Sequence, residues 1–263
     1  MSRTYARLFA RPVFAKLNRV LFEFSLRGLG ILNWENWSLS GEKWFLEAYL
    51  PEKLRDRAEP VFFDVGANVG RYSTTLAERF PEGSGYAFEA HPDNFERLAK
   101  ALETTRFTAT GQVVGSKAGS FPLYDYKDER FGSSHASFTS QVLEDCHRGE
   151  ARSVEVPVIS MDDFCASKGI ERIDLLKIDV EGHELEVLKG AKELLRKRSV
   201  GIIQLEFNFT HIYSRVMFSD FTDLLDDYSI YRLLPNSLLP LDQASLTESH
   251  LFAFQNLVAV LND

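Results

Sequence analysis

The sequence predicts an α/β fold in which a parallel sheet is doubly wound and carries helices on both faces. Two observations predict it. Apolar runs of strand length alternate with segments of helical periodicity along most of the 263 residues, as they do in parallel sheets. The first apolar run ends at an aspartate and a glycine-rich turn, and a helical segment follows. With 44% hydrophobic and 26% charged residues, the chain can fill one sizeable core. We expect a helical N-terminal appendage over residues 1–45 and one α/β domain over residues 46–263.

The first third of the chain is expected to alternate regularly between strands and helices. Apolar runs bounded by glycine and proline predict short buried strands, and a helix cannot continue through Pro81. The expected elements are a strand over 61–63, a helix over 71–80, a strand over 85–89, a helix over 92–102 and a third strand that ends near Val114.

Residues 118–158 interrupt the alternation. Strands are expected at 121–126 and 153–158, and the polar stretch between them, which contains His135, is interpreted as a surface loop near a site. Short connections and right-handed crossovers then favour a doubly wound sheet. The later elements are a strand over 173–178, a helix over 181–197, a strand over 200–207, a helix over 216–228 and strands over 230–234 and 251–261.

Charge is distributed unevenly along the chain. The formal net charge of −8 argues against a general nucleic-acid binder, because phosphate neutralisation needs a basic face. Six basic residues and one acidic residue give residues 1–32 a charge of +5, which leaves −13 for the rest. No apolar run approaches the roughly 20 residues that cross a bilayer.

Residues 1–32 predict an amphipathic helix. Phe14, Leu17, Leu21 and Phe24 recur at helical spacing, and charged side chains lie between them. Those charges interrupt the apolar stretch, so a secretory signal is not expected. The apolar stripe either packs on the main domain or on a second subunit of a homo-oligomer, or it attaches weakly to a membrane surface with anionic lipid.

The two cysteines predict neither a disulfide framework nor a zinc site. Cys146 and Cys165 lie far apart, and neither belongs to a CxxC pattern. A reducing, cytoplasmic location is therefore expected.

A glycine loop follows the first strand. Gly66 and Gly70 give a GxxxG spacing, not the GxGxxG that seats the pyrophosphate of a dinucleotide. Gly66 permits a tight turn, and Asn68 tolerates left-handed geometry. Glu89 ends the next strand, where an acidic side chain can accept hydrogen bonds from both hydroxyls of a ribose. The pattern indicates a nucleoside site, and the alternative is a structural turn beside a solvated glutamate.

Four segments carry a more specific pattern. They are VFFDVGANVG at 61–70, FEAHP at 88–92, SMDDF at 160–164 and LLKIDVEGHE at 175–184. Together they resemble the FkbM family of S-adenosylmethionine-dependent methyltransferases, and the similarity covers about residues 40–210. The glycine loop alone is common to many methyltransferases, whereas the KIDVEGHE run is much more specific.

This resemblance implies a Rossmann-like, class I methyltransferase sheet of seven strands with a reversed final hairpin. It also implies S-adenosylmethionine at the carboxyl ends of the first strands, and methylation of an oxygen, often on a sugar or polyketide. The residues that it places around the cofactor are Asp64, Gly66, Ala67, Asn68 and Gly70 at the methionine part, Glu89 at the ribose, and Ala90 and Ser116 on the adenine side.

A second group of acids ends two later strands. Asp179 and Glu206 follow adjacent parallel strands, so both are expected at the sheet edge that carries the glycine loop. With Asn208 they form a set of oxygen ligands that would suit Mg²⁺, so a divalent metal is one hypothesis. Without metal, Asp179, Glu206 or His183 would remove or orient the hydroxyl proton. For His183 the alternative is a place in a polar first helical turn.

The leading hypothesis is an O-methyltransferase that acts on a hydroxyl of a carbohydrate, glycolipid or glycosylated natural product. Its alternative is a nucleoside-binding module without catalysis, in which the Asp179 and Glu206 edge is structural. A NAD-dependent oxidoreductase is disfavoured by the missing GxGxxG.

Overall fold

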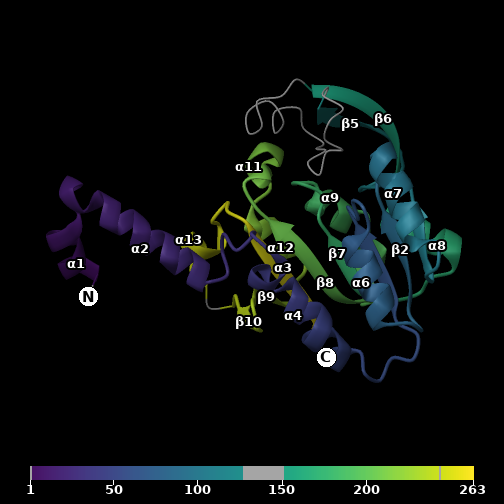
Figure 1. Ribbon diagram of the computed structural model, residues 1–263, viewed down its shortest axis with the longest axis horizontal. Helices are drawn as coiled ribbons and strands as arrows, with labels where there is room; N and C mark the ends of the chain where they lie inside the picture. The colour runs from purple at the N-terminus through teal and green to yellow at the C-terminus, as the bar shows by residue number, and fades with distance from the viewer. Residues whose placement is uncertain (1, 127–150, 243) are drawn as a thin grey trace.

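The main sheet of the computed structural model, which describes residues 2–126, 151–242 and 244–263, has eight strands (Figure 1). Their order across the sheet is β10-β9-β11-β8-β7-β1-β2-β3. Their bounds are β1 Val61–Val65, β2 Ser84–Phe88, β3 Phe107–Thr110, β7 Ile173–Ile178, β8 Val200–Phe207, β9 Tyr228–Leu234, β10 Ser237–Pro240 and β11 Gln255–Leu261.

Five of these strands are parallel, and the order of the chain reverses between β1 and β7. The predicted doubly wound sheet is therefore confirmed, with its switch point at the carboxyl ends of β1 and β7. Strand β11 is inserted antiparallel between β8 and β9, which confirms the reversed end of the sheet. The expectation of seven strands was one too few, because a hairpin adds β10 to β9 at the edge.

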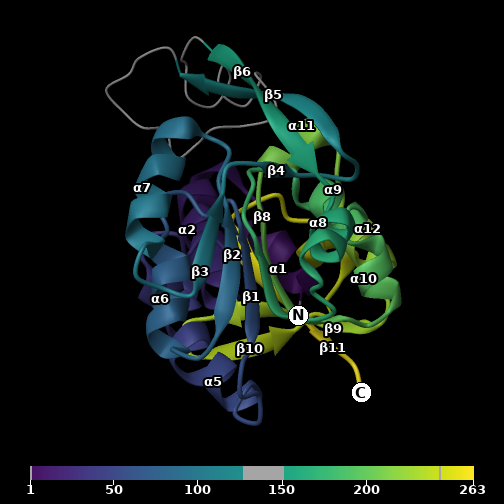
Figure 2. The same ribbon diagram turned by 90° about the vertical axis from the view of Figure 1, so that its right-hand side faces the viewer.

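Helices cover both faces of the sheet, as predicted (Figure 2). One face packs against Phe45, Leu76 and Leu98, and the other packs against Phe164, Leu188 and other buried side chains. The first face carries η2 Phe45–Tyr49, α5 Leu50–Lys53, α6 Arg71–Arg79 and α7 Pro92–Leu102. The second carries α8 Met161–Lys168, α9 Glu184–Lys189, α10 Lys192–Arg196 and α12 Phe218–Leu224. The other helices are α3 Trp37–Ser40, α4 Glu42–Trp44, α11 Thr210–Ser214 and α13 Leu246–Ser249.

The helix expected over 181–197 is two helices, α9 and α10. It starts late because Glu181 and Gly182 have positive φ angles, 52° and 96°. It breaks at Gly190, where an added Cβ would overlap the carbonyl oxygen of Gly115. Its apolar side chains Leu185, Leu188, Ala191 and Leu195 are nevertheless all buried.

A small second sheet lies at the carboxyl end of the main one. It has the order β4-β6-β5, with β4 Val113–Val114, β5 Gly119–Tyr126 and β6 Ala151–Ile159. Strand β4 follows the end of β3 after two residues, so the third strand predicted to run to Val114 is split between two sheets. The predicted strands at 121–126 and 153–158 are confirmed. The loop that holds His135, and Cys146, lie outside the described residues.

The N-terminal helices α1 Ser2–Phe9, η1 Pro12–Phe14 and α2 Ala15–Gly28 form an arm that projects from the body (Figure 1). The amphipathic helix is confirmed, but its stripe does not pack on the main domain, because Leu17, Leu21 and Phe24 are 46%, 43% and 67% exposed. Only near the body does α2 become buried, at Leu26. Among the described residues, no helix combines the length and apolar character needed to cross a bilayer.

Candidate active site

The glycine loop connects β1 to α6 and is held between two neighbouring strands. The amide groups of Gly66 and Ala67 donate to the carbonyl oxygen of Phe88, at 3.0 and 2.9 Å. Gly66 has a φ of 84°, and an added Cβ would overlap the carbonyl oxygen of Asp179. Asn68 adopts the left-handed conformation that its residue type tolerates, with a φ of 50°. The loop backbone is thus pressed against the residue that follows β7.

Glu89 fastens this loop to the start of α7. Its Oε2 accepts a hydrogen bond from the amide of Asn68 at 2.9 Å, and its Oε1 accepts one from the amide of His91 at 2.8 Å. Burial raises the pKa of Glu89, and these two amide donors oppose that rise. Each carboxylate oxygen can accept a second hydrogen bond, so the arrangement leaves acceptor capacity for two ribose hydroxyls.

Asp64 lies beneath the loop and is fully buried. Its Oδ2 accepts a hydrogen bond from the hydroxyl of Ser73 at 2.6 Å, which ties the end of β1 to α6. Its Oδ1 has no hydrogen bond among the described residues and lies 3.8 Å from the ammonium of Lys177. Burial raises the pKa of Asp64, while Lys177 lowers it. Asp64 therefore supports the loop from below.

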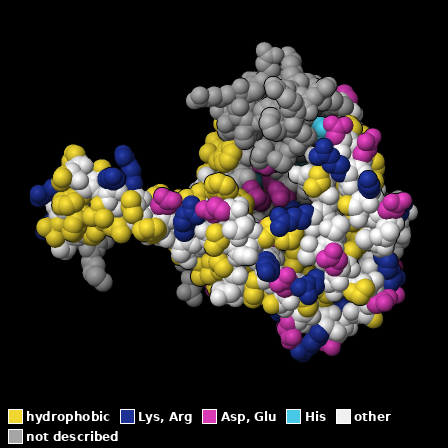
Figure 3. Space-filling view, viewed as in Figure 1, with side chains coloured by type: hydrophobic (Ala, Val, Ile, Leu, Met, Phe, Trp, Pro, Cys, Tyr) yellow, Lys and Arg dark blue, Asp and Glu magenta, His cyan; other side chains and the backbone are white. Residues whose placement is uncertain are grey.

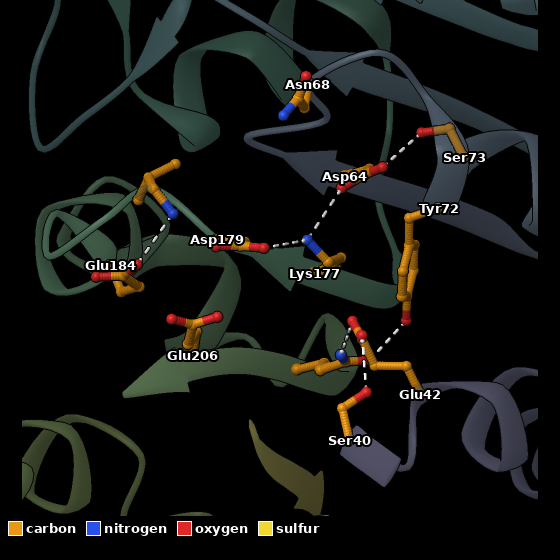
Figure 4. A network of polar contacts seen from close by, with 12 residues as sticks. Ser40, Glu42, Asp64, Asn68, Tyr72, Ser73, Lys177, Asp179, Glu184 and Glu206 are labelled. Atoms are coloured by element: carbon orange, nitrogen blue, oxygen red, sulfur yellow. Dashed lines mark hydrogen bonds and ion pairs between the residues drawn. The ribbon is translucent and has the colours of Figure 1, made fainter. Parts of the chain in front are cut away.

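Lys177 lies between the carboxylates of Asp64 and Asp179 (Figure 4). The sequence analysis assigned it no role. Its side chain is 7% exposed, and its Nζ donates to Asp179 Oδ2 at 3.1 Å. It also lies 5.1 Å from the centre of the Tyr72 ring. Burial lowers the pKa of Lys177, yet the carboxylates around it, Asp179 first, raise it above its ordinary value. The available signal was a lysine within β7, a strand whose residues are all buried.

A second chain of polar contacts reaches the site from the N-terminal segment (Figure 4). The hydroxyl of Tyr72 donates to Gln204 at 2.6 Å, and Gln204 donates to Glu42 at 3.4 Å. The hydroxyl of Ser40 donates to the other oxygen of Glu42 at 3.1 Å. Burial raises the pKa of Glu42, and Lys177 opposes that rise. The sequence analysis assigned no role to Glu42, because this residue lies within the segment 1–45 that was interpreted as an appendage.

Asp179 and Glu206 lie at the same edge, as predicted from their strands (Figure 4). The side chain of Asp179 is 38% exposed, so one carboxylate of the network is open to an acceptor. Burial, followed by the charges of Asp179 and Glu181, raises the pKa of Glu206 well above its ordinary value of 4.5. The amide nitrogen of Asn208 donates to Glu206 Oε1. A carboxyl group whose pKa is raised and an ion-paired carboxylate therefore lie at the same edge of the sheet.

This arrangement does not fit the divalent metal that was one hypothesis for Asp179, Glu206 and Asn208. The Asn208 oxygen accepts a hydrogen bond from the amide of Thr210 at 2.7 Å, and its NH₂ group faces Glu206. The Lys177 ammonium already neutralises Asp179. Among the residues that the structure describes, no group of three or more His, Cys, Asp or Glu side chains could hold a metal ion.

His183 lies immediately before α9 and packs against β5. Its ring centre is 5.7 Å from that of Phe121. Burial lowers the pKa of His183, so the imidazole is neutral and able to accept a proton at neutral pH. The polar helix start that was its alternative is built mainly by Glu184, which accepts from the amide of Val180 at 2.9 Å and lies 3.0 Å from His211.

The two residues expected on the adenine side lie apart from this network. Ala90 is half-buried against Val113 and Val156, next to Glu89. Ser116 is exposed and hydrogen-bonds the carboxylate of Glu186 in α9. Both assignments stay predictions.

The site as a whole is rich in acidic side chains. Four of them, those of Glu42, Asp64, Asp179 and Glu206, share the network with one ammonium group, that of Lys177, and burial raises the pKa of Glu42, Asp64 and Glu206. Figure 3 shows acidic side chains gathered in a hollow on this face of the molecule. Such a pocket favours a cationic ligand, because its low-dielectric walls strengthen the field of the carboxylates.

Comparisons with known proteins identify the family of the chain. The family model of the methyltransferase FkbM domain matches residues 64–231. The hexuronic acid methyltransferase AglP of Haloferax volcanii is 26% identical over 74% of this chain and 74% of its own length. The 31-O-demethyl-FK506 methyltransferase FkbM of Streptomyces tacrolimicus is 30% identical over 55% of this chain and 64% of its own.

Likeness to solved structures is distant. The plantazolicin methyltransferase BpumL, solved in complex with SAH, covers 98% of this chain and 93% of its own at 10% identity, with a TM-score of 0.43. The fold therefore rests on the strand order described above.

Proposed function

Because the chain belongs to the FkbM family of methyltransferases, we propose that it transfers a methyl group from S-adenosylmethionine to a hydroxyl of a carbohydrate, glycolipid or glycosylated natural product. The names of two relatives support this proposal. AglP is a hexuronic acid methyltransferase, which supports a carbohydrate acceptor. NoeI of Sinorhizobium fredii, 23% identical over 70% of this chain and 79% of its own, is a 2-O-methyltransferase, which supports transfer to an oxygen. The cytoplasmic location stays a prediction.

The observation that carries the proposal is the joint placement of the glycine loop and the acidic network at one sheet edge. The loop presents backbone beside Glu89, whose two oxygens lie at the end of β2. The adjoining acidic side chains outnumber the single ammonium of Lys177, which suits a ligand that carries a sulfonium and an ammonium group. Residues 66–70 and Glu89 would hold this cofactor, which supplies an electrophilic methyl group.

For the transfer itself, this chain supplies position and a proton acceptor. A hydroxyl next to Asp179 would donate its hydrogen bond to the exposed carboxylate and lose its proton there as the new bond forms. Lys177 holds that carboxylate in an ion pair, and Glu206, whose raised pKa favours its protonated form, adds a donor that orients the acceptor oxygen. Holding donor and acceptor in line contributes as much as roughly 7 to 11 kcal/mol in favourable systems. A strong base is therefore not required.

Neutral His183 is the competing proton acceptor. If it is the base, its substitution by Gln lowers turnover more than substitution of Asp179 by Asn does. If Asp179 is the base, the order is reversed.

The direct test of activity is transfer of labelled methyl from S-adenosylmethionine to a panel of uronic acid glycosides, oligosaccharides and glycolipids. Incorporation into an acceptor hydroxyl, located by mass spectrometry, supports the proposal. Tight cofactor binding without transfer to any glycan in the panel would favour the nucleoside-binding alternative.

A variant then tests the acceptor side alone. We predict that Asp179→Asn lowers turnover by about a hundredfold or more, the usual contribution of a positioned base. S-adenosylhomocysteine affinity, measured by calorimetry, should stay nearly unchanged, because the loop contacts Asp179 through its backbone. Asp56→Asn, at a carboxylate that is 93% exposed, is the matched control. Turnover equal to that of the wild type would remove Asp179 from the mechanism.

A further inference from the structure

The arm, residues 2–28, is an ordered helical element. The hydroxyl of Tyr5 in α1 donates to Asn18 in α2 at 2.7 Å, and the Asn18 amide donates to the carbonyl oxygen of Phe9 at 3.0 Å. The rings of Tyr5 and Phe9 stack with their centres 4.8 Å apart. These contacts fold the two helices against each other, so the surface that they present is fixed.

That surface is apolar and uncovered. Four side chains of α2 recur at the spacing of one helix face and lie 41–67% exposed: Leu17, Val20, Leu21 and Phe24. Val13, at the bend between the two helices, is 79% exposed. Figure 3 shows these hydrophobic side chains massed along the arm. An apolar stripe of this length on a helix that leaves the body indicates a surface that is covered by something else.

The basic side chains of the arm indicate the kind of surface that covers its apolar stripe. Arg27, nearest the body, is paired with Glu23 and Glu35. The other five basic side chains of the arm form no ion pair with any residue that the structure describes: Arg3, Arg7, Arg11, Lys16 and Arg19. An arm with five unpaired cations repels a second arm, which disfavours arm-to-arm packing. The same cations attract a surface of anionic headgroups, and exposed Phe and Leu side chains insert below such headgroups.

We propose that the arm docks on the surface of a membrane that contains anionic lipid, with its apolar stripe in the headgroup region. This inference is independent of the chemistry at the active site. It assigns to residues 2–28 a lipid-binding role that the methyltransferase domain at residues 64–231 does not include.

The test is sedimentation of the full-length protein with vesicles of phosphatidylcholine alone and with added phosphatidylglycerol. We expect binding to the mixed vesicles to be at least about tenfold tighter than to neutral ones, and to weaken as salt is raised. Two variants separate the two forces. The charge variant combines Arg7→Glu, Arg11→Glu and Lys16→Glu, and the apolar variant combines Leu21→Ser and Phe24→Ser.

Both variants should lose binding to the mixed vesicles by at least about tenfold while circular dichroism and thermal unfolding of the body stay unchanged. A control with the same charge change on the body, Lys100→Glu with Lys192→Glu and Lys197→Glu at exposed positions, should bind as the wild type does. Equal binding to both vesicle types, or none, overturns the proposal. So does a concentration-dependent dimer in sedimentation velocity that the apolar variant abolishes, because the covering surface would then be a second copy of the chain.

Discussion

The ammonium group of Lys177 is the point at which the two halves of the site meet. It lies 3.8 Å from Asp64, at the end of β1, and 3.1 Å from Asp179, just after β7. Both Lys177 and Asp64 are almost fully excluded from solvent. A buried pair of this kind contributes little net stability, but the loss of one partner leaves an uncompensated charge.

We therefore predict that Lys177→Met lowers the free energy of unfolding by about 3 to 5 kcal/mol. The double variant with Asp64→Asn should recover part of that loss, because the buried carboxylate of Asp64 is then no longer left without its partner. Urea unfolding of the wild type, both single variants and the double variant measures the coupling. Strictly additive losses would show that the two charges do not interact.

The titration of Glu206 makes the free energy of unfolding depend on pH. Its pKa in the folded state lies above its ordinary value of 4.5, so the folded protein holds a proton that the unfolded chain releases. Its contribution to stability is fully present below pH 4.5 and is lost as the pH rises through the folded-state pKa.

Glu206→Gln removes this titration and keeps the shape of the side chain. At neutral pH the variant should be more stable than the wild type, and the difference should shrink by about 1.4 kcal/mol for each pH unit across the window toward 4.5. Urea unfolding at a series of pH values checks this. Parallel pH profiles for the two proteins would contradict the raised pKa.

At the scale of elements, the glycine loop is held by backbone contacts from two strands. Its amides donate to the end of β2, and Gly66 touches the backbone that follows β7. No side chain can be accommodated at Gly66, where φ is 84°.

We predict that Gly66→Ala destabilises the protein by more than about 2 kcal/mol, since positive φ costs an alanine roughly 1 to 2 kcal/mol before any overlap is counted. Gly28→Ala is the control, because an added Cβ there meets nothing within 4 Å and the residue ends α2. Thermal unfolding compares the two. A Gly66→Ala protein as stable as the control would show that the loop is not pressed against β7.

The elements also show where prediction from sequence works. Buried strands and the glycine loop can be predicted from short stretches of sequence, because an apolar run or a left-handed turn is compatible with few other backbone conformations. The break between α9 and α10 does not, because Gly190 is constrained by Gly115, a residue far away in sequence. The extra strand β10 also escaped prediction, since its pairing with β9 depends on a hairpin at the sheet edge.

At the scale of the whole molecule, the site is assembled from distant parts of the chain. The placement of Asp64, Glu89, Asp179 and Glu206 at one sheet edge was predictable because each lies at the end of a strand of one parallel sheet. Glu42 was not, since its contact with Gln204 spans 162 positions and comes from a segment outside the sheet. Long-range polar contacts leave no periodic signal in a single sequence, whereas strand ends do.

The arm and the body carry net charges of opposite sign. Residues 1–32 carry +5 and the rest carries −13. The anionic surface proposed for the arm and the cationic cofactor proposed for the site match these opposite signs.

The central claim is that a sulfonium nucleoside binds where β1 and β2 end, with its ribose on Glu89. Calorimetric titration of S-adenosylhomocysteine into the wild type and Glu89→Ala tests it most directly, with Glu59→Ala, at a side chain that is 72% exposed, as the control. We predict one site in the wild type and the control, and an affinity at least about tenfold weaker, or 1.4 kcal/mol, in Glu89→Ala. Equal affinity in all three proteins, or no binding by the wild type, would contradict it.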